Sequence, residues 1–182
     1  DTGFGGSHVE NCVFDWDSNA QNFVTMLRNG QDNVVIENNQ FRAEDTAGTQ
    51  VGVLLRQGIY PTVKNNFFYG QFDSVGSAAA TAAGAITYDT TGVVASGVRI
   101  EDNTIASSDS AAALLINIDA ALAHRGIVVG NKLATYDTAT ADTAQVAFGS
   151  LLALNNQMIT RDSDVQQSIV STRVMRGVLD SG

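Results

Sequence analysis

The chain has 182 residues, 44% of them hydrophobic and only 16% charged, so it is long enough for one domain with a buried core. Acidic residues outnumber basic residues by 19 to 10, and the net charge is −9. This charge repels phosphate groups and anionic lipids, so we expect neither nucleic acid nor a membrane surface as a partner.

A six-residue pattern recurs along the chain, with apolar residues at its first and sixth places and asparagine at its fourth. The six copies are residues 9–14, 36–41, 63–68, 100–105, 128–133 and 153–158. Cys12 takes the asparagine place in the first copy. Successive copies start 27, 27, 37, 28 and 25 residues apart. This spacing indicates a structural repeat of about 27 residues.

A second apolar segment follows the pattern in most repeats, after polar turn residues. These segments are residues 23–27, 51–55, 85–88, 113–118 and 146–148. Their apolar residues alternate or run in fours and fives, which is typical of short strands rather than of helices. We expect the tail, residues 169–179, to form one more partial repeat.

A single repeat buries its inner face only when neighbouring repeats stack on it. Stacking at roughly 4.8 Å would pair each strand in parallel with its equivalent in the next repeat. The sequence therefore predicts an all-β, right-handed, single-stranded parallel β-helix of about six to seven coils, with the hand taken from the general rule for parallel crossovers. Residues 1–182 would form one such domain, and we expect it to be part of a longer chain.

The fourth-place asparagines would form a column at a turn, between two apolar columns. Asparagine tolerates the left-handed backbone conformation, and its amide can bond to the asparagine of the next coil. At the end of the column, Cys12 is expected to be a small buried hydrophobic residue and not a nucleophile. The predicted structural ladder consists of Asn39, Asn66, Asn103, Asn131 and Asn156.

The longest period contains an excess of about ten residues. Its small, low-complexity residues lie within 70–84 and predict a loop inserted into the third coil. Two interpretations stay open. The loop is either an insertion without a function or a contact for a partner or ligand, because insertions on a solenoid cluster on its binding face.

Aspartates follow the pattern at nearly the same distance in successive repeats. Three interpretations of this acidic column stay open. Aspartate is a common turn residue and needs no other role. A hard cation such as calcium could bridge adjacent turns, or a carboxylate pair could serve as general acid and base in glycoside hydrolysis. The candidate catalytic residues are Asp17, Asp45, Asp73 and Asp109.

Residues 15–19 match the beginning of a calcium-binding loop, with Asp15, Asp17 and Asn19 as candidate oxygen ligands. Ala20 replaces the glycine that an EF-hand requires next, so an EF-hand is not predicted. We therefore expect no cofactor, and calcium is the one ion that the sequence leaves open.

Histidines and aromatic residues carry weaker signals. His8 and His124 fall in different repeats and show no metal-ligand spacing. Exposed aromatic rings could stack on sugars, although aromatic residues in strands more often pack against other side chains. The aromatic residues considered are Trp16, Tyr60, Tyr69 and Tyr88.

The apolar-x-x-Asn-x-apolar pattern at this period resembles the pectate-lyase-like right-handed β-helix superfamily, which includes pectinases, other polysaccharide lyases and phage tailspikes. The resemblance spans nearly the whole chain and implies the coil, not the chemistry. Resemblance to pectate lyases would imply clustered aspartates for calcium and an arginine base. Arg56 and Arg99 lie near candidate carboxylates, but the surrounding motif is absent, and the polygalacturonase motif series is absent as a set.

We expect a non-catalytic structural β-helix on the exterior of a phage virion: a capsid decoration or head-fibre protein, or a segment of a tail spike or fibre. Resemblance to phage β-helices implies a homotrimer. Open ends would expose unpaired strand edges, so we expect further chain, or a capsid or tail protein, to cap them. The alternative is a polysaccharide lyase or glycoside hydrolase acting on a surface polysaccharide. A calcium-stabilised extracellular adhesin is a third hypothesis.

Overall fold

The structure is a computed structural model that describes part of the chain. The described residues are 6–16, 22–26, 33–43, 51–55, 60–70, 72, 84–88, 96–107, 114–118, 125–135, 146–147, 151–160 and 163–169. Every regular element in them is a β-strand. No helix long and apolar enough to cross a membrane occurs in this part of the chain.

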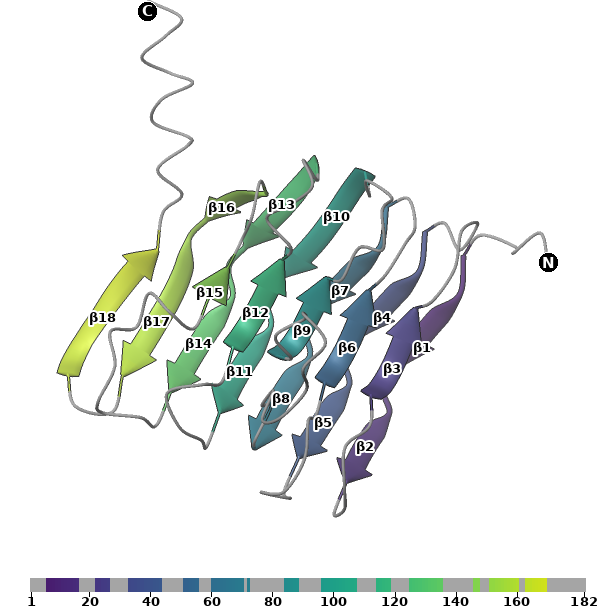
Figure 1. Cartoon of the computed structure of the whole chain (residues 1–182), viewed down its shortest axis with the longest axis horizontal. Helices are drawn as coiled ribbons and strands as arrows, with labels where there is room; N and C mark the ends of the chain where they lie inside the picture. The colour runs from purple at the N-terminus through teal and green to yellow at the C-terminus, as the bar shows by residue number, and fades with distance from the viewer. Residues whose placement is uncertain are drawn as a thin grey trace, which may run out of the picture.

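The strands form three sheets (Figure 1). Sheet A contains β1 (His8–Glu10), β4 (Val35–Glu37), β7 (Thr62–Lys64), β10 (Ser96–Glu101), β13 (Arg125–Val129) and β16 (Leu152–Leu154). Sheet B contains β2 (Val13–Trp16), β5 (Gln40–Ala43), β8 (Phe67–Gly70), β11 (Thr104–Ser107), β14 (Lys132–Thr135), β17 (Asn156–Thr160) and β18 (Ser163–Ile169). Sheet C contains β3 (Asn22–Met26), β6 (Val51–Leu55), β9 (Gly84–Tyr88), β12 (Leu114–Ile118) and β15 (Val146–Ala147).

Neighbouring strands within a sheet come from successive repeats, and they pair in parallel throughout sheets A and C. Figure 1 shows this order as a progression from purple β1–β3 at one end to yellow β18 at the other. The first places of the six-residue pattern are in register across sheet A, and the sixth places are in register across sheet B from β2 to β17. The prediction of an all-β chain with parallel strands is therefore confirmed.

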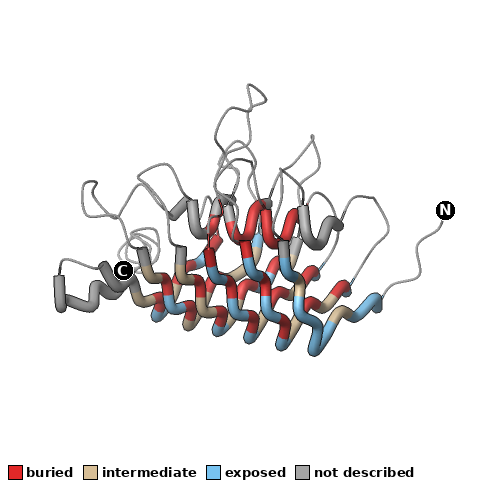
Figure 2. Tube along the Cα trace, turned by 90° about the horizontal axis from the view of Figure 1, so that it is seen from below, coloured by how far each residue is buried: buried red, intermediate tan, exposed pale blue. Residues whose placement is uncertain are grey.

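The core is formed by the inward faces of the strands. Buried and exposed positions alternate in β5 and β8 of sheet B, and a buried position lies between two partly exposed ones in β4 and β7 of sheet A (Figure 2), as expected for strands with one face toward a core. In β6, by contrast, all five residues are buried. The first-place side chains from Ile36 to Ala153 are at most 1% exposed, so the apolar column of the pattern lies in the core.

Within sheet B, phenylalanine rings from successive repeats stack on one another. The ring of Phe41 stacks on Phe14 with a centroid distance of 4.8 Å and on Phe68 with one of 4.6 Å. The interplanar angles are 8° and 6°. These distances match the spacing of hydrogen-bonded strands, roughly 4.8 Å, so strand pairing itself sets the separation of the rings. Phe72 packs edge-on against Phe68 at 5.8 Å.

The predicted insertion at residues 70–84 is described only at Gly70, Phe72 and Gly84. Gly70 is the last residue of β8 and Gly84 the first of β9, and the predicted loop between them stays a prediction, because apart from Phe72 it lies outside the described residues. Phe72 is buried in the core. Gly70 has φ +111°, and a Cβ there would lie 2.0 Å from the carbonyl oxygen of Ala43 on the neighbouring strand. Only glycine fits this close approach.

The end of the chain departs from the predicted parallel repeat. β18 pairs antiparallel with β17, and Thr160 lies opposite Ser163. The two-residue connection allows a hairpin, whereas a parallel crossover needs about a dozen residues or more. Of the predicted partial repeat 169–179, only Ile169 is described, as the last residue of β18.

Candidate functional site

The fourth-place asparagines lie in a continuous buried column between sheets A and B. Each is at most 2% exposed. From Asn39 to Asn131, the side-chain amide of each donates a hydrogen bond to the Oδ1 atom of the next, at 2.8–3.0 Å. The backbone N–H of each donates to the same Oδ1, at 3.0–3.1 Å. The column brings together Asn39, Asn66, Asn103, Asn131 and Asn156.

The amides also bond backward, to the previous repeat. Asn66 Nδ2 donates to the carbonyl oxygen of Ile36 at 2.9 Å, and Asn103 Nδ2 donates to that of Val63 at 2.9 Å. Each inner asparagine therefore contacts the repeats on both of its sides. Because a buried amide without partners is costly, the column favours one alignment of successive repeats.

The left-handed backbone conformation occurs one place earlier than the ladder. Third-place residues have positive φ angles: Asn11 57°, Asn38 56°, Asn65 55°, Asp102 52°, Gly130 70° and Asn155 52°. The expectation that the fourth-place asparagines take the left-handed conformation is therefore wrong. The third-place asparagines and Asp102 are exposed. In each turn, the third-place residue therefore takes the left-handed backbone conformation, and the side chain of the fourth-place asparagine makes the hydrogen bonds of the ladder.

Cys12 is exposed, which contradicts the prediction of a buried residue. Its backbone N–H donates to Oδ1 of Asn39 at 3.0 Å, so it occupies the end position of the ladder. Its thiol lies 3.3 Å from the carbonyl oxygen of Glu10. Since β1 and β2 are the terminal strands of their sheets on this side, no described repeat stacks over Cys12.

Most of the predicted carboxylate and calcium candidates lie outside the described residues. These are Asp17, Asn19, Asp45, Asp73 and Asp109. Asp15 is described and exposed, on the outer face of sheet B, and its carboxylate lies 3.8 Å from the guanidinium of Arg42. Asp15 therefore contacts a cation of the neighbouring strand.

A charged column on the outer face of sheet A was missed by the sequence argument. The second-place residues Glu10, Glu37, Lys64 and Glu101 are in register on β1, β4, β7 and β10. His8 precedes Glu10 by two residues and therefore shares its face of the strand. The two-residue spacing of His8 and Glu10, combined with the 27-residue repeat that relates Glu10 to Glu37, was the signal available in the sequence. The comparison of His8 with His124, which lies outside the described residues, does not reveal this column.

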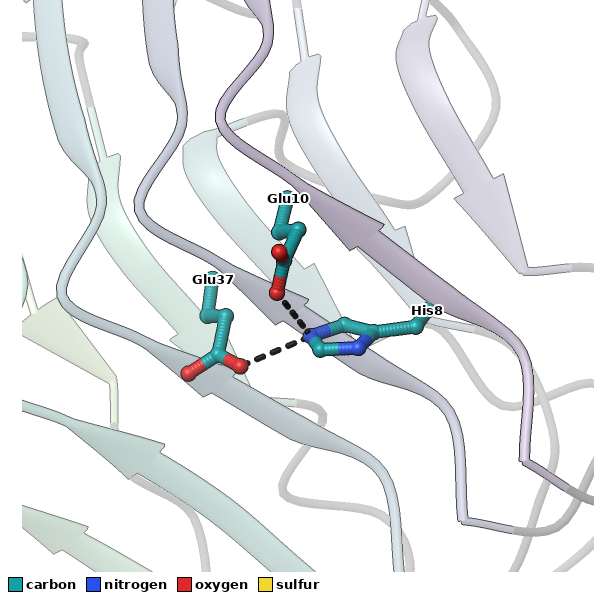
Figure 3. Close-up of side chains that lie close together, drawn as sticks. All are labelled: His8, Glu10 and Glu37. Atoms are coloured by element: carbon teal, nitrogen blue, oxygen red, sulfur yellow. Dashed lines mark hydrogen bonds and ion pairs between the residues drawn. The ribbon is translucent and has the colours of Figure 1, made fainter.

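His8, Glu10 and Glu37 converge on one point (Figure 3). Nε2 of His8 lies 2.7 Å from Oε1 of Glu37 and 3.1 Å from Oε2 of Glu10. The other oxygen of Glu37 lies 2.8 Å from Nζ of Lys64. Side chains of His8 and Glu10 are 44% and 47% exposed, and that of Glu37 only 15%.

The charge state of Glu37 follows from these contacts. The hydrogen bond from Lys64 lowers the pKa of Glu37, partial burial opposes this, and the hydrogen bond from His8 lowers the pKa further. Glu37 is therefore an anion at neutral pH. A general acid needs the opposite shift, toward the working pH, so this carboxylate is suited to binding a cation and not to donating a proton.

A shallow pocket of about 230 Å³ lies farther along the same sheet, at β10 and β13. Tyr60, 55% exposed with φ +58°, forms one wall. A Cβ at Gly97 would lie 2.0 Å from the tyrosine ring, so glycine lets the ring approach the backbone. Arg99 also lines the pocket, but its guanidinium bonds Glu101 at 2.7–2.8 Å. Among the described residues, the partner of Arg99 is therefore Glu101, in an ion pair, and not a catalytic aspartate.

The outer face of sheet A becomes apolar beyond this pocket. Ile127 pairs in register with Leu152, and Val129 with Leu154. Val128 and Ala153, which lie between these residues on the two strands, are buried. The side chains of Ile127, Val129, Leu152 and Leu154 therefore point outward. Leu152 is 38% exposed.

Comparison of the chain with protein-family models, with curated protein sequences and with solved structures gives no match. No relative therefore supplies a function or a set of site residues. The resemblance to β-helix proteins remains an expectation from the repeat, and the function is inferred from the described side chains.

Proposed function

We propose that the chain is a right-handed, single-stranded parallel β-helix of about six to seven coils with a non-catalytic, structural role. The observation that carries this proposal is the buried ladder from Asn39 to Asn156, in which each amide bonds to the next. The order of strands, with successive repeats adjacent in all three sheets, supports the same architecture. Repetition of this kind gives a stiff module in which each repeat stabilises its neighbours.

We place this module on the exterior of a phage virion, as a capsid decoration or head-fibre protein or as a segment of a tail spike or fibre. The support is the resemblance of the repeat to phage β-helices, together with the small share of charged residues, 16%.

The alternative function is a polysaccharide lyase or glycoside hydrolase. The observation in its favour is the pocket beside Tyr60, whose exposed ring could stack on a sugar. To separate the two functions, the chain is incubated with polygalacturonate, alginate and bacterial capsule. We expect no new reducing ends and no absorbance from unsaturated uronates. Cleavage that disappears on changing Asp17, Asp45, Asp73 or Asp109 to asparagine would establish the enzyme instead.

We also propose that the chain forms a homotrimer and that further chain, or a capsid or tail protein, covers the ends of the stack. The apolar patch of Leu152, which is exposed, and the partly exposed Ile127, Val129 and Leu154 supports a subunit contact, since contiguous apolar side chains on a surface are typical of interfaces. Sedimentation equilibrium should give three times the chain mass. Leu152→Glu should shift the protein toward monomer, while Thr104→Glu on sheet B should not. A wild-type monomer would contradict the trimer.

A further inference from the structure

We propose that His8, Glu10 and Glu37 form a binding site for a divalent transition-metal ion, with Zn²⁺ as the best match. The three side chains come from the outer face of adjacent strands β1 and β4 (Figure 3). One imidazole nitrogen and two carboxylate oxygens are available, and these atoms lie within 4.8 Å of one another. This role goes beyond the structural function proposed above.

The contacts of one nitrogen atom carry the proposal. Oxygens of Glu10 and Glu37 both approach Nε2 of His8, at 3.1 and 2.7 Å. A ring nitrogen holds at most one hydrogen, which makes a linear hydrogen bond to only one of these oxygens. A cation on the nitrogen lone pair would accept electrons from all three atoms at once. Convergence of two anions on one ring nitrogen therefore suits a metal ion better than a proton.

The distances between the ligand atoms of His8, Glu10 and Glu37 need only small changes to match those of a zinc site. In a tetrahedral zinc site the bonds to nitrogen and oxygen are about 2.0–2.2 Å, which places ligand atoms about 3.4 Å apart. The side chains of His8 and Glu10, 44% and 47% exposed, have room to move by this amount. Glu37, 15% exposed, is the fixed member. The fourth position would be taken by water.

Lys64 holds Glu37 in the required orientation. Its ammonium lies 2.8 Å from Oε2 of Glu37, so Oε1 is the atom that faces His8. Metal-binding carboxylates are commonly oriented in this way by a second hydrogen-bond partner. A mixed set of one imidazole and two carboxylates favours zinc over calcium and magnesium, which prefer oxygen ligands alone.

A bound ion would fasten β1 to β4. Among the described strands, β1 is the terminal strand of sheet A and has a neighbour on one side only. The pairing of β1 with β4 involves three residues in each strand, as most pairings of sheet A do. A metal bridge between Glu10 and Glu37 would reinforce this edge directly.

Isothermal titration of the full chain with ZnCl₂ tests the site. All proteins carry Cys12→Ser, because the exposed thiol is itself a metal ligand. We expect one Zn²⁺ per chain, with Ca²⁺ bound at least a hundredfold more weakly. His8→Gln and Glu37→Gln should each weaken Zn²⁺ binding more than tenfold. The matched control is Glu101→Gln, which lies in the same column but pairs with Arg99, and it should change binding less than twofold.

Cobalt gives a second readout that does not depend on affinity alone. Co²⁺ at this site should give visible absorption bands of a four-coordinate ion, and His8→Gln should abolish them. Unchanged circular dichroism of the variants in chelator would show that they fold. The proposal is overturned if Zn²⁺ does not bind at one per chain, if His8→Gln binds as tightly as the parent, or if Glu101→Gln loses as much affinity as Glu37→Gln.

Discussion

Phe68→Ala is expected to lower the free energy of unfolding by about 3–5 kcal/mol, the usual cost of truncating a buried phenylalanine. Phe68 is fully buried, stacks on Phe41 at 4.6 Å and meets Phe72 edge-on at 5.8 Å. Removing the ring leaves a cavity that both neighbours line, and the stacked pair with Phe41 is lost as well. Urea denaturation followed by circular dichroism measures the change.

Phe67→Ala is the matched control, because Phe67 precedes Phe68 on β8 and points to the opposite face. Phe67 is 41% exposed, so we expect its truncation to cost less than about 1 kcal/mol. Comparable losses from the two substitutions would contradict the inward assignment of β8. A register slip by one residue would exchange the two faces in this way.

Asn66→Ala is expected to destabilise the chain to a similar degree, by about 3–5 kcal/mol, through hydrogen bonding and not through packing. Oδ1 of Asn66 accepts from both the backbone N–H and the amide of Asn39, at 3.0 Å each. Truncation leaves these two buried donors without the acceptor that they share. Its amide bonds to Ile36 and Asn103 are lost too. For a chain of this size the melting temperature should fall by roughly 10 °C.

Asn65→Gly provides the control within the same turn. Asn65 is exposed with φ 55°, a conformation that glycine adopts without a steric penalty. We expect a change within about 0.5 kcal/mol. If Asn65→Gly were as harmful as Asn66→Ala, the division of the turn into a backbone position and a side-chain position would be incorrect.

The candidate site shows where sequence reasoning stopped. The spacing of His8 and His124 carries no metal-site signal, whereas Glu10 lies two residues from His8 on the same strand face. Glu37 comes 27 residues after Glu10, which is one repeat. Glu37, the second carboxylate near His8, therefore lies in the same column as Glu10, one repeat further along the chain. Applying the period of two within a strand and the period of 27 between strands together would have identified the cluster.

The repeat determined the all-β class, the parallel pairing and the membership of the asparagine column, because in-register stacking acts identically on every copy of a pattern. Side-chain chemistry alone could not determine which asparagine of each pair takes the left-handed conformation, since both tolerate it. The tertiary structure decided that, by burying the fourth place and exposing the third. It also decided the two ends of the described part of the chain: Cys12 is exposed, and β18 turns back antiparallel across a two-residue connection. Periodicity describes repeats that have an equivalent neighbour on both sides, whereas the outermost described strands are shaped by the contacts on one side.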